Sequence, residues 1–100
     1  MANKTNPGEP TPRREIKITD SIAGGEYANA MQVNHSRDEF QLMFLNIMGA
    51  NGKVAAKVMT TPSHFKRMIA AMQDNLAKYE KQFGEVKEAD KLDKEIGFKG

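Results

Sequence analysis

The sequence predicts an α+β fold in two layers, a four-stranded antiparallel meander followed by one long amphipathic helix that covers it. Two observations carry this prediction. Residues 61–84 place large apolar side chains every three or four positions, which is the spacing of one continuous stripe on a helix. Residues 26–60 show instead the short alternating or fully apolar runs between turn signals that are typical of strands. A sheet and a helix with one apolar face each are stable when they bury those faces against one another.

The 100 residues are enough for one domain, and we expect it to span residues 15–86. Residues 1–14 contain three prolines and almost no large apolar side chain, which predicts a disordered N-terminal arm. Residues 87–100 alternate charges around a few apolar positions, which predicts a flexible tail or a frayed helix. The first residues have no apolar core of the kind a secretory signal needs, and the absence of cysteine fits a reducing compartment. We therefore expect a cytoplasmic protein.

The first two strands are predicted from alternation. Residues 15–19 (EIKIT) alternate charged and β-branched side chains, which predicts a short edge strand with Ile16 and Ile18 facing inward. Two glycines then turn the chain, and residues 26–35 alternate apolar with small or polar side chains, as a second strand does. Its apolar face consists of Tyr27, Met31 and Val33.

The third and fourth strands form a predicted hairpin. Residues 39–48 (EFQLMFLNIM) are apolar on both faces, so both faces of this strand must be covered. The Asn51-Gly52 pair tolerates the positive φ angles of a type I′ turn, which predicts the hairpin turn at that pair. Residues 53–60 (KVAAKVMT) then form the last strand.

The helix carries signals for its start, its apolar face and its end. Thr61 is a good N-cap, and Pro62 suits the first helical position, where an N–H has no intrahelical partner. Gly84 is expected to end the helix, because glycine readily adopts the positive φ of a C-terminal cap. The apolar stripe between them, which we call the helix seam, consists of Phe65, Ile69, Met72, Leu76, Tyr79 and Phe83.

Beyond these patterns, residues 16–86 resemble a family of short prokaryotic proteins known only as a domain of unknown function. The resemblance is carried by Tyr27-Ala28-Asn29, His35-Ser36, Glu39-Phe40, Thr61-Pro62, His64, Lys66-Arg67, Asn75, Tyr79-Glu80 and Phe83-Gly84. Members of that family often have a proline-containing linker where this chain has residues 49–52. The resemblance implies no established activity, cofactor or catalytic residue. Through the genes that accompany the family in some bacteria, it implies a link to transcription, with RNA polymerase as a protein partner.

Burial predicts a homodimer. One helix covers one face of the sheet, so the other face would expose Met43, Leu45 and Ile47 together. An uncovered apolar patch of this kind is typical of an interface, and two-fold pairing is the commonest way to close it. Exchanging the two faces leaves this conclusion unchanged. Alternatively, the seven-residue repeat of the helix makes a helix–helix contact while the sheets pair edge to edge.

Residue types give little support to catalysis, metal binding or a membrane span. His35 and His64 are the only histidines, and without cysteine a metal would depend on scattered carboxylates. His35, Ser36 and Asp38 have the residue types of a nucleophilic triad, but triads normally draw their members from separate elements. The longest uncharged run, residues 40–52, is too short to cross a bilayer. We therefore expect a protein that is not an enzyme and has no metal, cofactor or membrane insertion.

The polar face of the helix carries a sparse basic stripe. Arg67, Lys78 and Lys81 fall within about 60° of one another and opposite the helix seam. Asp74 lies in the same stripe, and the net charge of the chain is only +2. A solvated face is therefore favoured over a phosphate-binding one.

Three functional hypotheses follow from these features. The leading one is a non-enzymatic interaction or accessory protein that acts as a dimeric binding module. The first alternative is a nucleic-acid-binding or transcription-associated protein that uses the basic stripe. The second alternative is a chaperone-like binder of exposed apolar segments, because the meander and helix are similar in outline to the secretory chaperone fold.

Overall fold

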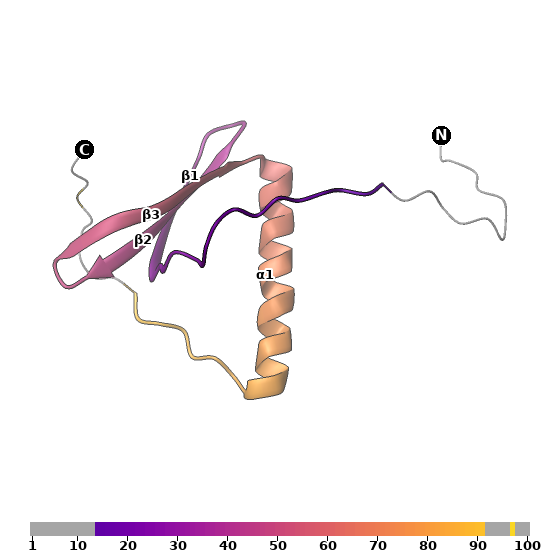
Figure 1. Ribbon diagram of the computed structural model, residues 1–100. Helices are drawn as coiled ribbons and strands as arrows, with labels where there is room; N and C mark the ends of the chain where they lie inside the picture. The colour runs from indigo at the N-terminus through magenta and orange to yellow at the C-terminus, as the bar shows by residue number, and fades with distance from the viewer. Residues whose placement is uncertain (1–13, 92–96, 98–100) are drawn as a thin grey trace, which may run out of the picture.

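The computed structural model describes residues 14–91 and residue 97 of the chain. This part forms three strands and one helix, in the order β1 (Ala30–His35), β2 (Phe40–Met48), β3 (Asn51–Thr60) and α1 (Pro62–Phe83) (Figure 1). The strands make one antiparallel sheet in the order β1-β2-β3, so β2 is paired on both sides. The predicted α+β class, with an antiparallel sheet followed by one helix, is confirmed.

The first of the four predicted strands is not formed. Residues 15–19 have no regular secondary structure, and Ile16 and Ile18 are 80% and 85% exposed instead of facing inward. Alternation alone did not make this segment a strand. Two isoleucines bury too little surface to offset the backbone entropy of ordering the segment along a sheet edge. The meander therefore begins at Ala30, after the first residues of the predicted second strand.

The hairpin turn lies two residues before the predicted position. Gly49 and Ala50 form the turn, and the predicted Asn51-Gly52 pair already belongs to β3. Gly49 has φ +61°, and no residue other than glycine has a positive φ in the described part of the chain, which is the pattern of a type II′ turn. Gly52 instead allows close packing against β2. A Cβ at this position would lie only 3.2 Å from Cγ1 of Ile47, which is closer than an ordinary van der Waals contact.

A β-bulge interrupts the pairing of β2 with β3. Phe44 pairs with Ala56 and Leu45 pairs with Val54, so Ala55 has no partner on β2. An extra residue of this kind bends the strand that carries it and increases its local twist. The two halves of β3 therefore meet β2 in different registers.

The register defines which apolar side chains share a face. Met31 lies opposite Phe44, and Val33 lies opposite Leu42, which in turn pairs with Val58. Because alternate residues of a strand point to the same side, these residues form one surface. We call it the sheet face; its members are Met31, Val33, Phe40, Leu42, Phe44 and Val58.

The side chain of Asn29 extends the sheet beyond the start of β1. Its Nδ2 donates to the carbonyl oxygen of Ile47 at 2.8 Å, and its Oδ1 accepts from the Ile47 N–H at 2.8 Å. The Asn29 backbone N–H also donates to the Leu45 carbonyl at 2.9 Å. The side-chain amide thus makes the two hydrogen bonds to Ile47 that the backbone of the preceding residue would make if β1 began earlier.

The fully buried core of one chain is very small. Among the described residues, only Leu42 and Leu45 are buried, at 0% and 4% exposure. Both lie on the central strand β2, three positions apart, and so point to opposite faces of the sheet. No other apolar side chain in this part of the chain is shielded to the same degree.

The helix has the predicted bounds. The Thr61 hydroxyl accepts from the His64 N–H at 3.2 Å, which caps the N-terminus, and Pro62 occupies the first helical position. At the other end Gly84, with φ +102°, donates its N–H to the Glu80 carbonyl at 2.8 Å. The Glu80 side chain then accepts from the N–H of Val86 at 2.9 Å. Both predicted helix ends are confirmed.

Candidate interaction surface

The helix meets the sheet only near its first turn. The ring of Phe65 stacks on the ring of Phe40, with centroids 4.2 Å apart and planes 7° apart. The ring centroid of His35, at the end of β1, lies 5.5 Å from that of Phe40 on β2. Beyond this contact α1 runs away from the strands, as Figure 1 shows. The aromatic stack therefore marks the corner where the two elements join.

The helix seam is uncovered over most of its length. No residue of α1 is buried, and the five seam residues after Phe65 are between 41% and 65% exposed. They are Ile69, Met72, Leu76, Tyr79 and Phe83. The prediction that the helix covers one face of its own sheet is wrong for the single chain. A regular apolar spacing determines which side of a helix is apolar, but it does not determine what lies against that side.

The connection between β3 and α1 explains why the helix stands off. Thr60 ends β3 and Pro62 begins α1, so Thr61 is the only residue between them. The backbone N–H of Phe65 bonds to the Thr61 carbonyl at 2.9 Å, and proline has a nearly fixed φ. This connection has no free residues with which to turn the helix back along the strand it has just left.

The sheet face on the side of the Phe40–Phe65 stack is also partly uncovered. Met31, Val33 and Val58 are 49%, 38% and 41% exposed. They surround Leu42, the most deeply buried side chain described. A single chain therefore presents two apolar surfaces, the helix seam and the sheet face, that share an edge but do not cover one another.

The predicted interface residues lie together on the opposite face of the sheet. Met43, Leu45 and Ile47 alternate along β2, as the sequence predicts. Leu45 is buried within the single chain, while Met43 and Ile47 are half-buried. The structure does not place these three side chains against another molecule, so their role in an interface stays a prediction.

The basic stripe is present on the solvent side of the helix. Arg67, Lys78 and Lys81 are exposed. Nζ of Lys78 lies 3.0 Å from Oδ2 of Asp74 one turn earlier, and both side chains are largely exposed. An exposed pair of this kind adds little stability, but it partly neutralises Lys78. The positive field of the stripe therefore rests mainly on Arg67 and Lys81.

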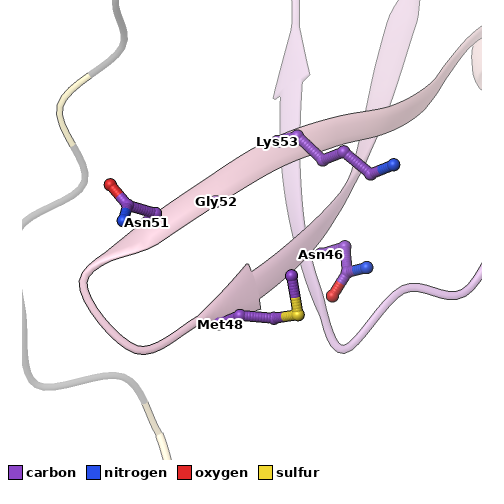
Figure 2. A pocket seen from close by; sticks show the side chains of 5 residues that line it. All are labelled: Asn46, Met48, Asn51, Gly52 and Lys53. Carbon is purple, nitrogen blue, oxygen red and sulfur yellow. The ribbon is translucent and has the colours of Figure 1, made fainter.

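A shallow hollow of about 290 Å³ lies at the end of the β2–β3 hairpin. Its lining consists of Asn46, Met48, Asn51, Gly52 and Lys53. Figure 2 shows the amide of Asn51 directed away from the polar ends of Asn46 and Lys53, so the polar groups do not converge on one point. Convergent polar groups are what orient a small ligand in a binding pocket. The hollow therefore resembles contact area at a hairpin tip more than a ligand site.

The histidines have structural environments. The His35 ring packs near Phe40, and His64 donates its backbone N–H to the helix cap. Within the described residues, no group of three His, Asp or Glu side chains gathers as a metal site requires. No helix in this part of the chain is long and apolar enough to cross a membrane.

The comparison with protein families agrees with the resemblance in the sequence. The family model for a protein of unknown function, DUF3467, matches residues 1–88. The chain belongs to this family. No curated protein and no solved structure matches the chain. Membership of DUF3467 therefore identifies the chain without assigning an activity to it.

Two positions that matter in this DUF3467 chain were missed from the sequence. Asn29 has its partner Ile47 eighteen positions away, so no local pattern could show its role. Gly49 could have been found, because a glycine at the first position of a two-residue loop is the signature of a type II′ hairpin. The neighbouring Asn51-Gly52 pair is a strong signal for a type I′ turn, and the turn was therefore predicted at that pair instead of at Gly49.

Proposed function

We propose that this protein is a non-enzymatic interaction module that works as a homodimer and presents a two-fold surface to another macromolecule. The observation that supports it most is the exposure of the helix seam. In a single chain, the five seam residues after Phe65 are each about half exposed. Soluble monomers rarely leave so continuous an apolar surface open to water. A second chain would remove it from solvent.

The small core supports the same proposal. Two buried leucines in the described part of the chain are few for a domain that must offset the conformational entropy of ordering a sheet and a 22-residue helix. Small domains without disulfides or metals commonly obtain the missing burial by oligomerisation. The chain has no cysteine, so disulfides cannot supply this stability.

A non-catalytic role is supported by the surroundings of the chemically capable side chains. His35 packs near an aromatic ring and His64 lies in the capped first turn of α1. General acid–base catalysis needs a group within hydrogen-bond reach of a substrate held in a pocket. The hairpin hollow has neither histidine in its lining.

Sedimentation equilibrium of the full chain, at protein concentrations from nanomolar to high micromolar, tests the dimer. We expect a mass of twice 11.1 kDa at micromolar concentration. A mass of one chain at the highest concentration would refute the proposal. Affinity purification of the tagged protein from its native cells then tests the partner, and RNA polymerase is the partner that the family resemblance suggests.

A second candidate function is nucleic-acid contact through the basic stripe. The observation that favours it is geometric: Arg67 and Lys81 are exposed on the side of α1 opposite the helix seam. If the seam is buried in a dimer, the stripe remains in solvent on each protomer. Its salt dependence gives a direct test, described below.

A chaperone-like role would use the same helix seam for a different occupant. The seam would then bind unfolded apolar segments in competition with the second copy. A reduced, unfolded model protein added to the dimer would test this role. Binding of that protein with release of monomers would favour it, and no effect on the dimer would exclude it.

A further inference from the structure

We propose that two copies of this chain exchange their helices, so that the helix seam of each copy lies on the sheet face of the other. This inference rests on the proposed homodimer and goes beyond it, because it names the two surfaces that meet. It also differs from the pairing expected from the sequence, in which the helix covers its own sheet and the interface lies on the far face.

Both surfaces belong to one chain, yet the structure does not bring them together. The Phe40–Phe65 stack, the Thr61 cap and the single-residue connection hold the start of α1 at the corner of the sheet. Folding the helix back over β1 and β2 would require a different backbone path at Thr61 and would displace the Phe65 ring from Phe40. A partner chain can reach the same sheet face without changing either of them.

The helix and the longest strand match in length. A helix of 22 residues extends about 33 Å at 1.5 Å per residue. The ten residues of β3 extend about 33 Å at roughly 3.3 Å per residue. A helix laid along the partner's strands would therefore cover the apolar sheet face with part of its seam and reach the hairpin end with the rest, where the same side of the sheet carries Asn46 and Lys53.

The area is close to that of a stable dimer. The exposed fractions are 41% to 65% for Ile69, Met72, Leu76, Tyr79 and Phe83, and 38% to 49% for Met31, Val33 and Val58. At roughly 100 Å² for each half-exposed large side chain, and less for the valines, the eight would bury on the order of 700 Å² per chain. A standard interface takes about 800 Å² from each partner.

The exchange also gives a closed dimer and not an open chain of copies. Each protomer would give one helix and receive one helix, which is a two-fold, self-complementary contact that leaves neither the helix seam nor the sheet face open to a third copy. Arg67, Lys78 and Lys81 lie opposite the seam and would remain in solvent. The interface would therefore be apolar in its centre, and the three cations of the stripe would keep their hydration.

Photo-crosslinking of mixed chains tests the proposal. The chain has no cysteine, so Leu76→Cys provides one site for a benzophenone probe on the helix seam. Probe-bearing unlabelled chains are mixed with isotope-labelled wild-type chains, irradiated at a concentration that gives dimers, and digested for mass spectrometry. We expect crosslinks from the probe to labelled peptides that contain Met31 and Val33, or Val58.

Three results would overturn the exchange. Crosslinks to sheet peptides of unlabelled chains alone, with none to labelled chains, would mean that the helix folds back. Crosslinks to the labelled helix would mean that the helices pair with one another. Crosslinks to labelled residues of the far sheet face, such as Met43, would mean that the dimer uses that face instead. In the last two cases the dimer itself stands, whereas a single-chain mass would remove both proposals.

Controls keep the experiment decisive. A probe at Lys81→Cys, on the opposite side of α1, should give no crosslinks to the partner's sheet face. Sedimentation of each probe-bearing chain shows whether it still forms a dimer. If the probe at position 76 prevents dimerisation, the reverse placement at Val33→Cys on β1 should find labelled peptides of the partner's helix seam. Failure of the second probe to reach that helix in a dimer would also overturn the exchange.

Discussion

Strand β2 and helix α1 obtain their structure in different ways. β2 is hydrogen-bonded on both sides, and it carries the two buried leucines of the described chain. α1 makes its backbone hydrogen bonds within itself, is capped at both ends, and has no buried residue. The strand therefore depends on long-range contacts that one chain supplies. The helix forms from local signals, and its apolar seam is left for contacts that one chain does not supply.

The largest effect should come from the strand. Leu42→Ala should lower the free energy of unfolding by about 2 to 5 kcal/mol, because it leaves a cavity at the most buried position. Denaturant titration measures the change. In contrast to a seam substitution, its effect should not depend on protein concentration, and a small effect would mean that β2 does not hold the core.

Leu76→Ala tests the other side of the comparison. Leu76 is 49% exposed in the single chain, so truncation should cost little there. If a second copy buries it, the loss should approach about 2 to 5 kcal/mol at concentrations where the wild type is a dimer. Unfolding followed at two protein concentrations separates the cases. Equal, negligible losses at both would show that the seam is not buried in the dimer.

Asn29→Ala should have an intermediate effect. It removes two hydrogen bonds of 2.8 Å that tie the start of the sheet to Ile47, and we expect a loss of about 1 to 2 kcal/mol. Amide hydrogen exchange at Ile47 should increase in step. Asn29→Asp is the informative companion, because a carboxylate can accept from the Ile47 N–H but cannot donate to its carbonyl. If the Ile47 amide exchanges at the same rate in the alanine variant, the two hydrogen bonds of the Asn29 side chain do not stabilise this end of the sheet.

Thr61→Ala should cost about 1 kcal/mol, since it removes the side chain that caps α1. Thr61→Ser keeps the hydroxyl and serves as the matched control. Thermal or denaturant unfolding monitored by helical circular dichroism measures both. If the serine and alanine variants lose the same amount, the cap is not the source of the effect.

The smallest effect on stability should come from the basic stripe. Changing Arg67, Lys78 and Lys81 together to glutamine should change the free energy of unfolding by less than about 0.5 kcal/mol, because all three are exposed. If the wild type binds nucleic acid, the triple variant should lose that binding. The logarithm of the wild-type affinity should fall with that of salt by about one unit for each phosphate contact. No wild-type binding at low salt in a gel-shift titration would end the nucleic-acid hypothesis.

Local chemistry made much of this fold predictable. Thr61, Pro62 and Gly84 define the helix ends through hydrogen bonds and φ preferences that act within one turn. The apolar run of residues 39–48 correctly indicated a strand. The same reasoning failed for residues 15–19 and for the hairpin turn. An edge strand needs a partner to pair with, and two overlapping turn signals competed within four residues.

The candidate site was only half predictable from the sequence. The spacing of Leu76 and its neighbours determined that one side of α1 is apolar. Only the tertiary structure shows that this side is exposed to solvent, that Leu45 is buried, and that the Asn29 side chain is hydrogen-bonded to Ile47. A helix stripe arises from residues three or four positions apart, so the sequence contains it. What covers the stripe depends on the angle at one connecting residue, Thr61, and on contacts between segments far apart in the chain or in different chains.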